Sequence, residues 1–362
     1  MKNKKILAVV ATAGLLFGTA ACSSSAEPSA DSAASGTTEQ VRVNSLNIVA
    51  MGPMFVAQEK GFFAEQGIEN TYTDADIYAQ MALQSQGNLD VNIPGLGGAF
   101  FNAINQNLNL SAVADRNQYK CTADSLLVVR TEEYDNGVDS VADLAGKNVA
   151  ILARGSSTEY WLSRALEEEG MTIDDLGALT TLGYPDIANA LKTGAVDAGF
   201  LAQPIGYGVL ADGTAKRLLA TYEIVPDEQQ GLITMSQKFI DERPEVAARW
   251  MAGWLEGVRY YLDPANRDEV VQIIAEGTSV PVETLDALYG TDQWPYMNPN
   301  GAVDTETAMD EDGAWLVENG IVDALPEVDQ WYNDSIVNAA LEIVGEVEDT
   351  RSCSDVTPLD VP

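Results

Sequence analysis

The sequence predicts an α/β protein with two open, mostly parallel sheets, followed by helices toward the C-terminal end. Three observations predict this fold class. Strand-like and helix-like segments alternate along the chain, which is typical of α/β folds. The alternation starts again after residues 126–130. Residues 41–347 have ordinary globular composition and exceed the size at which a single core usually divides, so we expect two lobes.

The N-terminal segment 1–21 has the layout of a secretory signal. Three lysines stand among the first five residues, and an apolar run of 12 residues follows at 6–17. That run is too short to span a bilayer, which needs about 20 residues. The placement of Cys22 resembles the lipobox of bacterial lipoproteins, and the alternative is an ordinary signal followed by an incidental cysteine. Residues 22–40 are rich in Ser and Ala, so we expect a disordered tether.

Four strand–helix steps make up the first predicted sheet. Pro53 stands where proline favours the start of a helix, and Pro94 closes the third strand. The expected strands are 43–50, 69–73, 90–93 and 110–114, and the expected helices begin at Pro53, at 78 and at 99.

The second predicted sheet repeats this alternation, and the chain then turns helical. The expected strands are 148–152, 179–182, 196–200 and 218–221, with helices at 141–144, 158–169, 187–193 and 204–210. From Pro244 onward, large apolar residues recur every three or four positions, which predicts a helix with one buried face. Further helices are expected at 282–289, 306–319 and 331–344.

Charge and missing residue types exclude several classes of function. The chain has 20 basic and 55 acidic residues, and loss of the three signal lysines changes its net charge from −35 to −38. Such a charge opposes nucleic acid and anionic membrane surfaces. The sequence has no histidine, which removes the commonest general base and the imidazole metal ligands. We therefore expect no enzymatic role, no cofactor, no metal site and no nucleic-acid partner.

Two cysteines remain once Cys22 carries a lipid. Cys121 and Cys353 are too few for a structural zinc site. In an oxidising compartment they predict either a disulfide that joins the tail, 348–362, to the body, or two free thiols. An acidic run at 310–313 does not match a calcium-binding loop, so we expect solvated surface there.

Three loops at the carboxyl ends of predicted strands have the form of ligand-binding loops. They are 51–53, 94–98 and 154–158, and each leads into a helix whose first N–H groups lack partners within the helix. The third loop has small residues that let a ligand approach the backbone, and hydroxyls that donate hydrogen bonds. Its alternative role is a plain helix cap made by Ser157 or Thr158.

Five stretches, taken in order, resemble the substrate-binding proteins of nitrate-, sulfonate-, taurine- and bicarbonate-type ABC importers. They are 52–63 (GPMFVAQEKGFF), 141–150 (VADLAGKNVA), 155–157 (GSS), 194–198 (GAVDA) and 236–247 (SQKFIDERPEVA). The resemblance implies a hinged, two-lobe periplasmic-binding fold of type II. It also implies a monomer that captures a small molecule and presents it to an importer permease.

The resemblance divides the body into two lobes that close on the ligand. One lobe would comprise 41–127 and 232–347, and the other 128–231, with crossovers near 126–130 and 231–236. The implied ligand-binding positions come from loops of both lobes. They are Met51, Pro53, Asp76, Ile77, Gly95, Leu96, Gly97, Ser156, Ser157, Thr158, Tyr184 and Gln203.

Arg116, which follows the fourth strand, is the best candidate to pair with a carboxylate or sulfonate. Its guanidinium is planar and offers two parallel donors. The alternatives are a salt bridge from Arg116 to a nearby acid, and Arg154 as the ligand's partner. We expect a small organic anion, either a sulfonate or an aromatic carboxylate.

Two other functions remain open. The ligand could be a neutral or cationic nitrogen heterocycle, in which case Asp74, Asp76 and Glu159 would matter more than Arg116. The protein could also be a ligand sensor that contacts a receptor. In each case we expect an extracytoplasmic protein held to the membrane through Cys22.

Overall fold

The computed structural model describes residues 38–44, 48–73 and 77–360, with side chains described outside 77–79. Cys22, Asp74 and Asp76 lie outside the described residues, so the expectations for them stay predictions. No helix within the described ranges is long and apolar enough to cross a membrane.

The first sheet has five strands in the order β2-β1-β3-β10-β4. β1 pairs with β2 in parallel, from Glu39 opposite Ile68 to Asn44 opposite Thr73. β10 runs antiparallel to both β3 and β4, so the other four strands share one direction. The strands are β1 (Glu39–Asn44), β2 (Ile68–Thr73), β3 (Val91–Asn92), β4 (Leu110–Gln118) and β10 (Gln229–Ser236).

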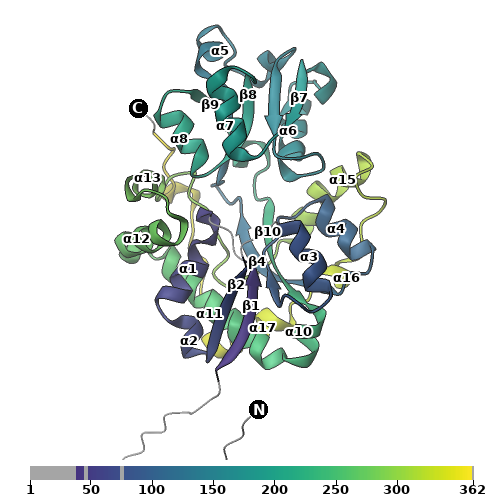
Figure 1. Cartoon of the computed structure of the whole chain (residues 1–362), viewed down its shortest axis with the longest axis vertical. Helices are drawn as coiled ribbons and strands as arrows, with labels where there is room; N and C mark the ends of the chain where they lie inside the picture. The colour runs from purple at the N-terminus through teal and green to yellow at the C-terminus, as the bar shows by residue number, and fades with distance from the viewer. Residues whose placement is uncertain (1–37, 45–47, 74–76, 361–362) are drawn as a thin grey trace, which may run out of the picture. The chain divides into compact units, whose positions relative to one another are not determined.

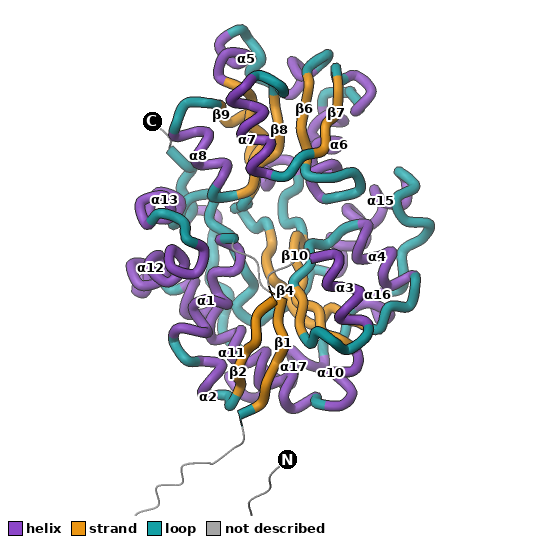
Figure 2. The backbone as a smooth tube through the Cα atoms, in the orientation of Figure 1, coloured by secondary structure: helices purple, strands orange, loops and turns teal. Residues whose placement is uncertain are grey.

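The second sheet repeats this plan with strands that come from the middle of the chain. Its order is β7-β6-β8-β5-β9, and β5 runs antiparallel to its neighbours β8 and β9. The strands are β5 (Ser125–Arg130), β6 (Asn148–Ile151), β7 (Ala178–Thr181), β8 (Ala198–Ala202) and β9 (Ala215–Ala220). The chain passes to this sheet through 119–124 and returns through 225–228 (Figure 2). The predicted α/β class with two mostly parallel sheets is confirmed, and in each sheet the one reversed strand is the strand that directly follows a crossing.

Helices accompany both sheets (Figure 1). Those on the first-sheet side before the crossing are α1 (Gly52–Glu59), α2 (Phe62–Glu65), α3 (Ile77–Ser85) and α4 (Gly98–Asn105). Those among the strands of the second sheet are α5 (Thr131–Asp135), α6 (Ser157–Glu168), α7 (Tyr184–Thr193), α8 (Ile205–Ala211) and α9 (Thr221–Ile224). The C-terminal helices are α10 (Gln237–Glu242), α11 (Pro244–Leu262), α12 (Arg267–Thr278), α13 (Val282–Leu288), α14 (Thr305–Thr307), α15 (Ala314–Glu318), α16 (Val328–Trp331) and α17 (Ser335–Val344).

The long helix α11 forms much of the core beneath the first sheet. Its predicted apolar face is buried, and Trp250 stacks on Phe63 of α2 with ring centroids 5.4 Å apart. α11 lies against α1 so closely that a Cβ at Gly257 would stand 2.4 Å from the carbonyl oxygen of Pro53. Glycine is therefore needed where the two helix backbones meet.

Several element boundaries differ from the predictions. The first strand ends at Asn44, and Val49–Met51 forms a 3-10 turn before α1 instead of continuing the strand. The predicted helix at 306–319 is interrupted, because Ala308–Gly313 is a π-helical segment between α14 and α15. α12 was not predicted.

Candidate functional site

The loop after β3 is one of the predicted binding loops, and it leads into α4. Gly95 forms an isolated bridge with Gly231 of β10, and the N–H of Leu96 donates to the carbonyl oxygen of Gln230 at 2.9 Å. Gly97 is the N-cap of α4 and makes no side-chain capping bond. The N–H groups of the first turn of α4 therefore have no partner within the helix.

The loop after β6 leads into α6 in the same way. The hydroxyl of Ser156 donates to the carbonyl oxygen of Ala153 at 2.7 Å, and that of Thr158 accepts from the N–H of Leu152 at 3.1 Å. These hydroxyls hold the turn together. Ser156 occupies the N-cap position without a side-chain capping bond, so the alternative of a helix capped by Ser157 or Thr158 is wrong.

These two loops, one from each sheet, lie against each other. A Cβ at Gly98 would stand 3.3 Å from the carbonyl oxygen of Gly155. A cavity of about 10 Å³ remains beside this contact, roughly the room of one water molecule. It is lined by Leu96, Gly97, Ser156, Ser157, Tyr160, Asp312, Trp315 and Leu316.

Two polar groups at this cavity have no hydrogen-bond partner among the described residues. They are the Tyr160 hydroxyl and Nε1 of Trp315. Their residues are only 2% and 5% exposed, respectively. Since buried polar groups without partners cost free energy, two of them at one small cavity make it a candidate place for a ligand that supplies the partners.

Two buried carboxyl groups meet behind the cavity. Asp312 forms a side-chain hydrogen bond with Glu228, and Nε1 of Trp161 donates to both carboxyl oxygens of Glu228 at 2.9 and 2.8 Å. Burial raises the pKa of both carboxyl groups above their usual range. Burial also raises the pKa of the Tyr160 hydroxyl, which therefore keeps its proton.

Arg116 lies on β4 near the other end of the Gly95–Gly97 loop. Its Nη2 donates to Oε1 of Gln230 at 2.6 Å. The guanidinium covers the Cα of Gly231, where an added Cβ would stand 2.2 Å from Nη2. Its charge opposes the rise that burial causes in the pKa of Asp124. The residue is 4% exposed, so a ligand would meet it only within the protein.

Arg154, the other predicted cation, is placed differently. Its side chain is exposed, and its Nε pairs with a carboxyl oxygen of Glu159 at 2.9 Å. The same carboxyl group accepts a hydrogen bond from the N–H of Gly155. Both Arg154 and Glu159 thus stabilise the loop after β6 through contacts within it.

The remaining predicted positions do not line the small cavity. Met51 is fully buried in the hydrophobic core, and Pro53 lies in the first turn of α1. Gln203 is buried, donates to Oε1 of Gln293 at 3.0 Å and accepts from the N–H of Tyr207 at 2.8 Å. Tyr184 begins α7 and packs against the core. Ile77 lies in α3, where its side chain is outside the described set.

Sequence reasoning missed the wall made by Tyr160, Asp312 and Trp315. The run 310–313 was expected to be solvated surface, and for Asp312 this is wrong because the residue is buried. The π-helical segment places Asp312 against Glu228, and Trp315 packs on Tyr160 with ring centroids 5.4 Å apart. The one signal in the sequence was a large apolar residue, Trp315, three positions after Asp312.

The two cysteines of the body are joined in the structure. A disulfide connects Cys121 and Cys353, whose Cα atoms are 5.3 Å apart. It holds the C-terminal tail against the segment that leaves the first sheet.

A protein-family model described as the NMT1-like family matches residues 34–275. The curated nitrate/nitrite binding protein NrtA of Nostoc sp. (strain PCC 7120) is 22% identical over 286 residues. That match covers 73% of this chain and 64% of the relative, so the chain spans somewhat less than two thirds of the relative's length. These matches confirm the resemblance that the sequence motifs indicate.

Solved structures share the fold. The periplasmic nitrate-binding protein NrtA of Synechocystis PCC 6803 superposes with a TM-score of 0.71 at 16% identity, covering 85% of this chain and 89% of that one. The aliphatic sulphonate binding protein SsuA of Escherichia coli gives 0.67 at 19% identity, covering 81% and 91%. The desulfurization enzyme DSZB gives 0.62 at 15% identity, covering 84% and 99%, so the fold also occurs in an enzyme.

Proposed function

We propose that this chain, which belongs to the NMT1-like family, is the extracytoplasmic solute-binding component of an ABC importer. It captures a small organic anion, either a sulfonate or an aromatic carboxylate, and delivers it to the permease. Relatives whose names give nitrate or sulphonate as the ligand support an anion. The proposal includes export, a lipid anchor at Cys22 and a monomeric binding protein without enzymatic activity.

The observation that carries this proposal is the polar cavity between the loops that follow β3 and β6. Its two unpartnered groups, the Tyr160 hydroxyl and Nε1 of Trp315, are hydrogen-bond donors. The first turns of α4 and α6 add uncapped N–H groups at the same place. A concentration of donors and positive helix ends favours carboxylate or sulfonate oxygens.

The buried carboxyl pair is compatible with an anion. Burial raises the pKa of both Glu228 and Asp312, which favours a form of the pair that shares one proton. One shared proton leaves one negative charge in place of two, so the pair repels a bound anion less than two ionised carboxylates would. Arg116 would complete the charge balance from the opposite end of the loop.

Ligand entry requires the two loops to separate. The small cavity holds about one water molecule, which is far less than an organic acid needs. The two crossings at 119–124 and 225–228 are the segments that would act as the hinge. The described arrangement then corresponds to closed loops.

A nitrogen heterocycle is the second candidate, and Asp312 is the observation in its favour. Oδ2 of Asp312 can accept a hydrogen bond from a ring N–H. Glu159, the other acid named for such a ligand, is already engaged by Arg154 and the N–H of Gly155. The anion is therefore the stronger candidate.

A ligand screen on the body from Gln40 onward tests the proposal. Sulfonates, aromatic mono- and dicarboxylates, pyrimidines and inorganic oxyanions would each be added in a thermal-shift assay, followed by calorimetry. A ligand at 100 times its dissociation constant adds about 2.7 kcal/mol of stability. Binding only by pyrimidines would favour the heterocycle, and no binding by any class would contradict capture of these solutes.

Tyr160→Phe gives a sharper result because the hydroxyl is buried without a partner. The substitution should raise the stability of the ligand-free protein, since an unsatisfied hydroxyl costs about 1–3 kcal/mol. It should also weaken ligand binding about tenfold. Tyr134→Phe, at a residue that is 36% exposed, is the matched control and should change neither quantity. Unchanged affinity in both Tyr160→Phe and Trp315→Phe would place the ligand elsewhere.

A further inference from the structure

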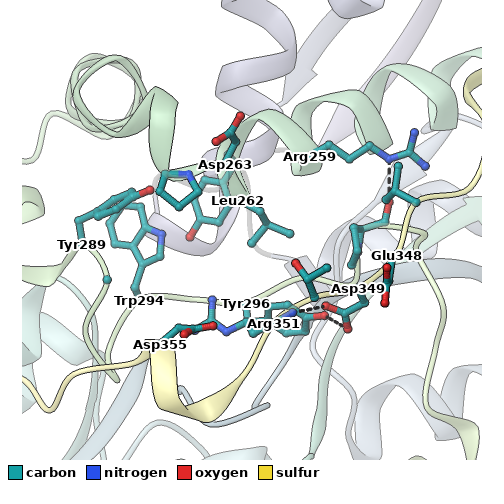
Figure 3. A pocket seen from close by; sticks show the side chains of 16 residues that line it. Arg259, Leu262, Asp263, Tyr289, Trp294, Tyr296, Glu348, Asp349, Arg351 and Asp355 are labelled. Atoms are coloured by element: carbon teal, nitrogen blue, oxygen red, sulfur yellow. Dashed lines mark hydrogen bonds between the residues drawn. The ribbon is translucent and has the colours of Figure 1, made fainter.

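A second cavity lies beneath the C-terminal segment 347–355, apart from the loops described above. Its volume is 510 Å³, which is within the range of small-molecule sites. Its walls are the end of α11, the segment 289–299 and the segment 347–355, which we call the strap (Figure 3). None of the residues expected to bind the transported ligand lines it.

One wall of this cavity is aromatic. Tyr261 and Trp294 are stacked, with ring centroids 5.4 Å apart and planes 9° apart. Tyr289 stands against Trp294 at 5.0 Å with its ring tilted by 53°. Figure 3 shows Tyr289 and Trp294 together on the side of the cavity opposite Arg259. Such a wall suits the face or edge of a planar ring.

Arg351 of the strap supplies a partly buried cation. Its guanidinium carbon lies 5.0 Å from the ring centroid of Tyr296, and Figure 3 shows the two side chains next to each other. Its Nε is buried and has no hydrogen-bond partner among the described residues. Burial also lowers the pKa of the Arg351 guanidinium, which reflects poor solvation of its charge.

Two other charged groups next to this position, Arg259 and Asp349, are already engaged. Arg259 donates to the carbonyl oxygens of Pro299, Val344 and Gly345. Asp349 accepts from Lys120 at 2.9 Å and from the Tyr296 hydroxyl at 2.6 Å. Arg351 is therefore the lining cation with donor capacity left for a ligand.

We propose that this cavity is a second binding site, for a small aromatic carboxylate whose carboxyl group pairs with Arg351 and whose ring lies against Trp294 and Tyr289. A planar guanidinium matches a carboxylate with two parallel hydrogen bonds. Such a ligand brings a partner to the guanidinium of Arg351 and covers the aromatic wall with one molecule. The exposed carboxyl groups of Glu348 and Asp355 at the strap favour a monoanion over a dianion.

The chain that carries Arg351 is fixed to the body just after that residue. Cys353 is bonded to Cys121, and the N–H of Asp292 donates to the carbonyl oxygen of Thr357 at 2.7 Å. The N–H of Leu359 donates to a carboxyl oxygen of Asp292 at 2.9 Å. The site is thus built before a ligand arrives, which limits the entropy lost on binding.

Calorimetric titration of the mature body with benzoate and 2-naphthoate tests the proposal. Both should bind, and Arg351→Gln should weaken binding about tenfold or more, since hydrogen bonds to charged groups are strong. Arg164→Gln, at an exposed residue paired with Glu167, is the matched control and should not change the affinity. Tyr289→Leu tests the aromatic wall without touching the almost fully buried Trp294, and it should also weaken binding.

The same titration separates this site from the proposed transport site. Tyr160→Phe and Trp315→Phe should leave binding at the strap unchanged. Loss of binding in those two variants with full retention in Arg351→Gln would assign the probes to the loops and overturn the strap site. No binding of either probe at millimolar concentration would also overturn it, whatever the transport screen finds.

Discussion

Cys353→Ser should lower the stability of the protein by as much as about 5 kcal/mol. The disulfide from Cys121 to Cys353 closes a loop with a sequence separation of 232. In the chain-entropy model, cross-linking a loop of this length lowers the entropy of the unfolded chain and stabilises the folded protein by about 5 kcal/mol. In a body of this size each kcal/mol moves the melting temperature by about 2 °C, so the shift should approach about 10 °C. Urea unfolding and a thermal melt measure both quantities.

The full effect requires that the strap unfolds together with the body. Without the disulfide, the strap keeps the 2.9 Å ion pair of Lys120 with Asp349 and the backbone bonds at Asp292. A half-exposed ion pair of this kind adds little. If the strap detaches first, the melt of the body changes less, and Arg351 loses its position before the body unfolds. The Cys353→Ser variant would then bind benzoate more weakly than wild type even though the melting temperature of its body is unchanged.

A matched comparison tests whether the bond itself is responsible. Cys121→Ser, Cys353→Ser and the double variant should all have the same stability, because each removes the same cross-link. Reduced wild-type protein should match them. Equal stability of oxidised wild type and Cys353→Ser, together with unchanged proteolysis of the strap, would refute the reasoning.

Two further predictions concern the polar groups around the loops. Because burial raises the pKa of Glu228 and Asp312 above their ordinary values of 4.5 and 3.8, the folded protein binds more protons than the unfolded chain above those values, and stability should fall as pH rises. Asp312→Asn should flatten this dependence in unfolding experiments between acidic and alkaline buffers, and an identical slope in variant and wild type would contradict it. Gly231→Ala should displace the guanidinium of Arg116 and cost about 1–3 kcal/mol with loss of ligand binding. Gly208→Ala has open space around its Cβ and should be neutral or slightly stabilising, so equal losses in the two variants would argue against the contact.

Much of the fold follows from local patterns in the sequence. Alternating segments predict both sheets, and the apolar stripe from Pro244 predicts α11 with its buried face. The reversed strands β5 and β10 could not be read in this way, because a strand's direction depends on where the chain has come from. The break between α14 and α15 was also missed, although the π-helical segment contains two aspartates and a glycine, which are weak helix formers.

The binding loops were predictable, whereas the groups that make the cavity polar were not. Small residues after a strand predict a loop that a ligand can approach. In the structure the Gly95–Gly97 and Ser156–Ser157 segments meet at the small cavity. Tyr160 and Trp161 are neighbours on α6, yet Trp161 donates to Glu228 while the Tyr160 hydroxyl has no acceptor among the described residues. Whether a buried donor is satisfied depends on groups far away in the sequence. An unsatisfied donor can therefore be recognised only when the surrounding structure is known. It points to a ligand more strongly than the loop motif does, because a buried donor without an acceptor costs free energy that a ligand would recover.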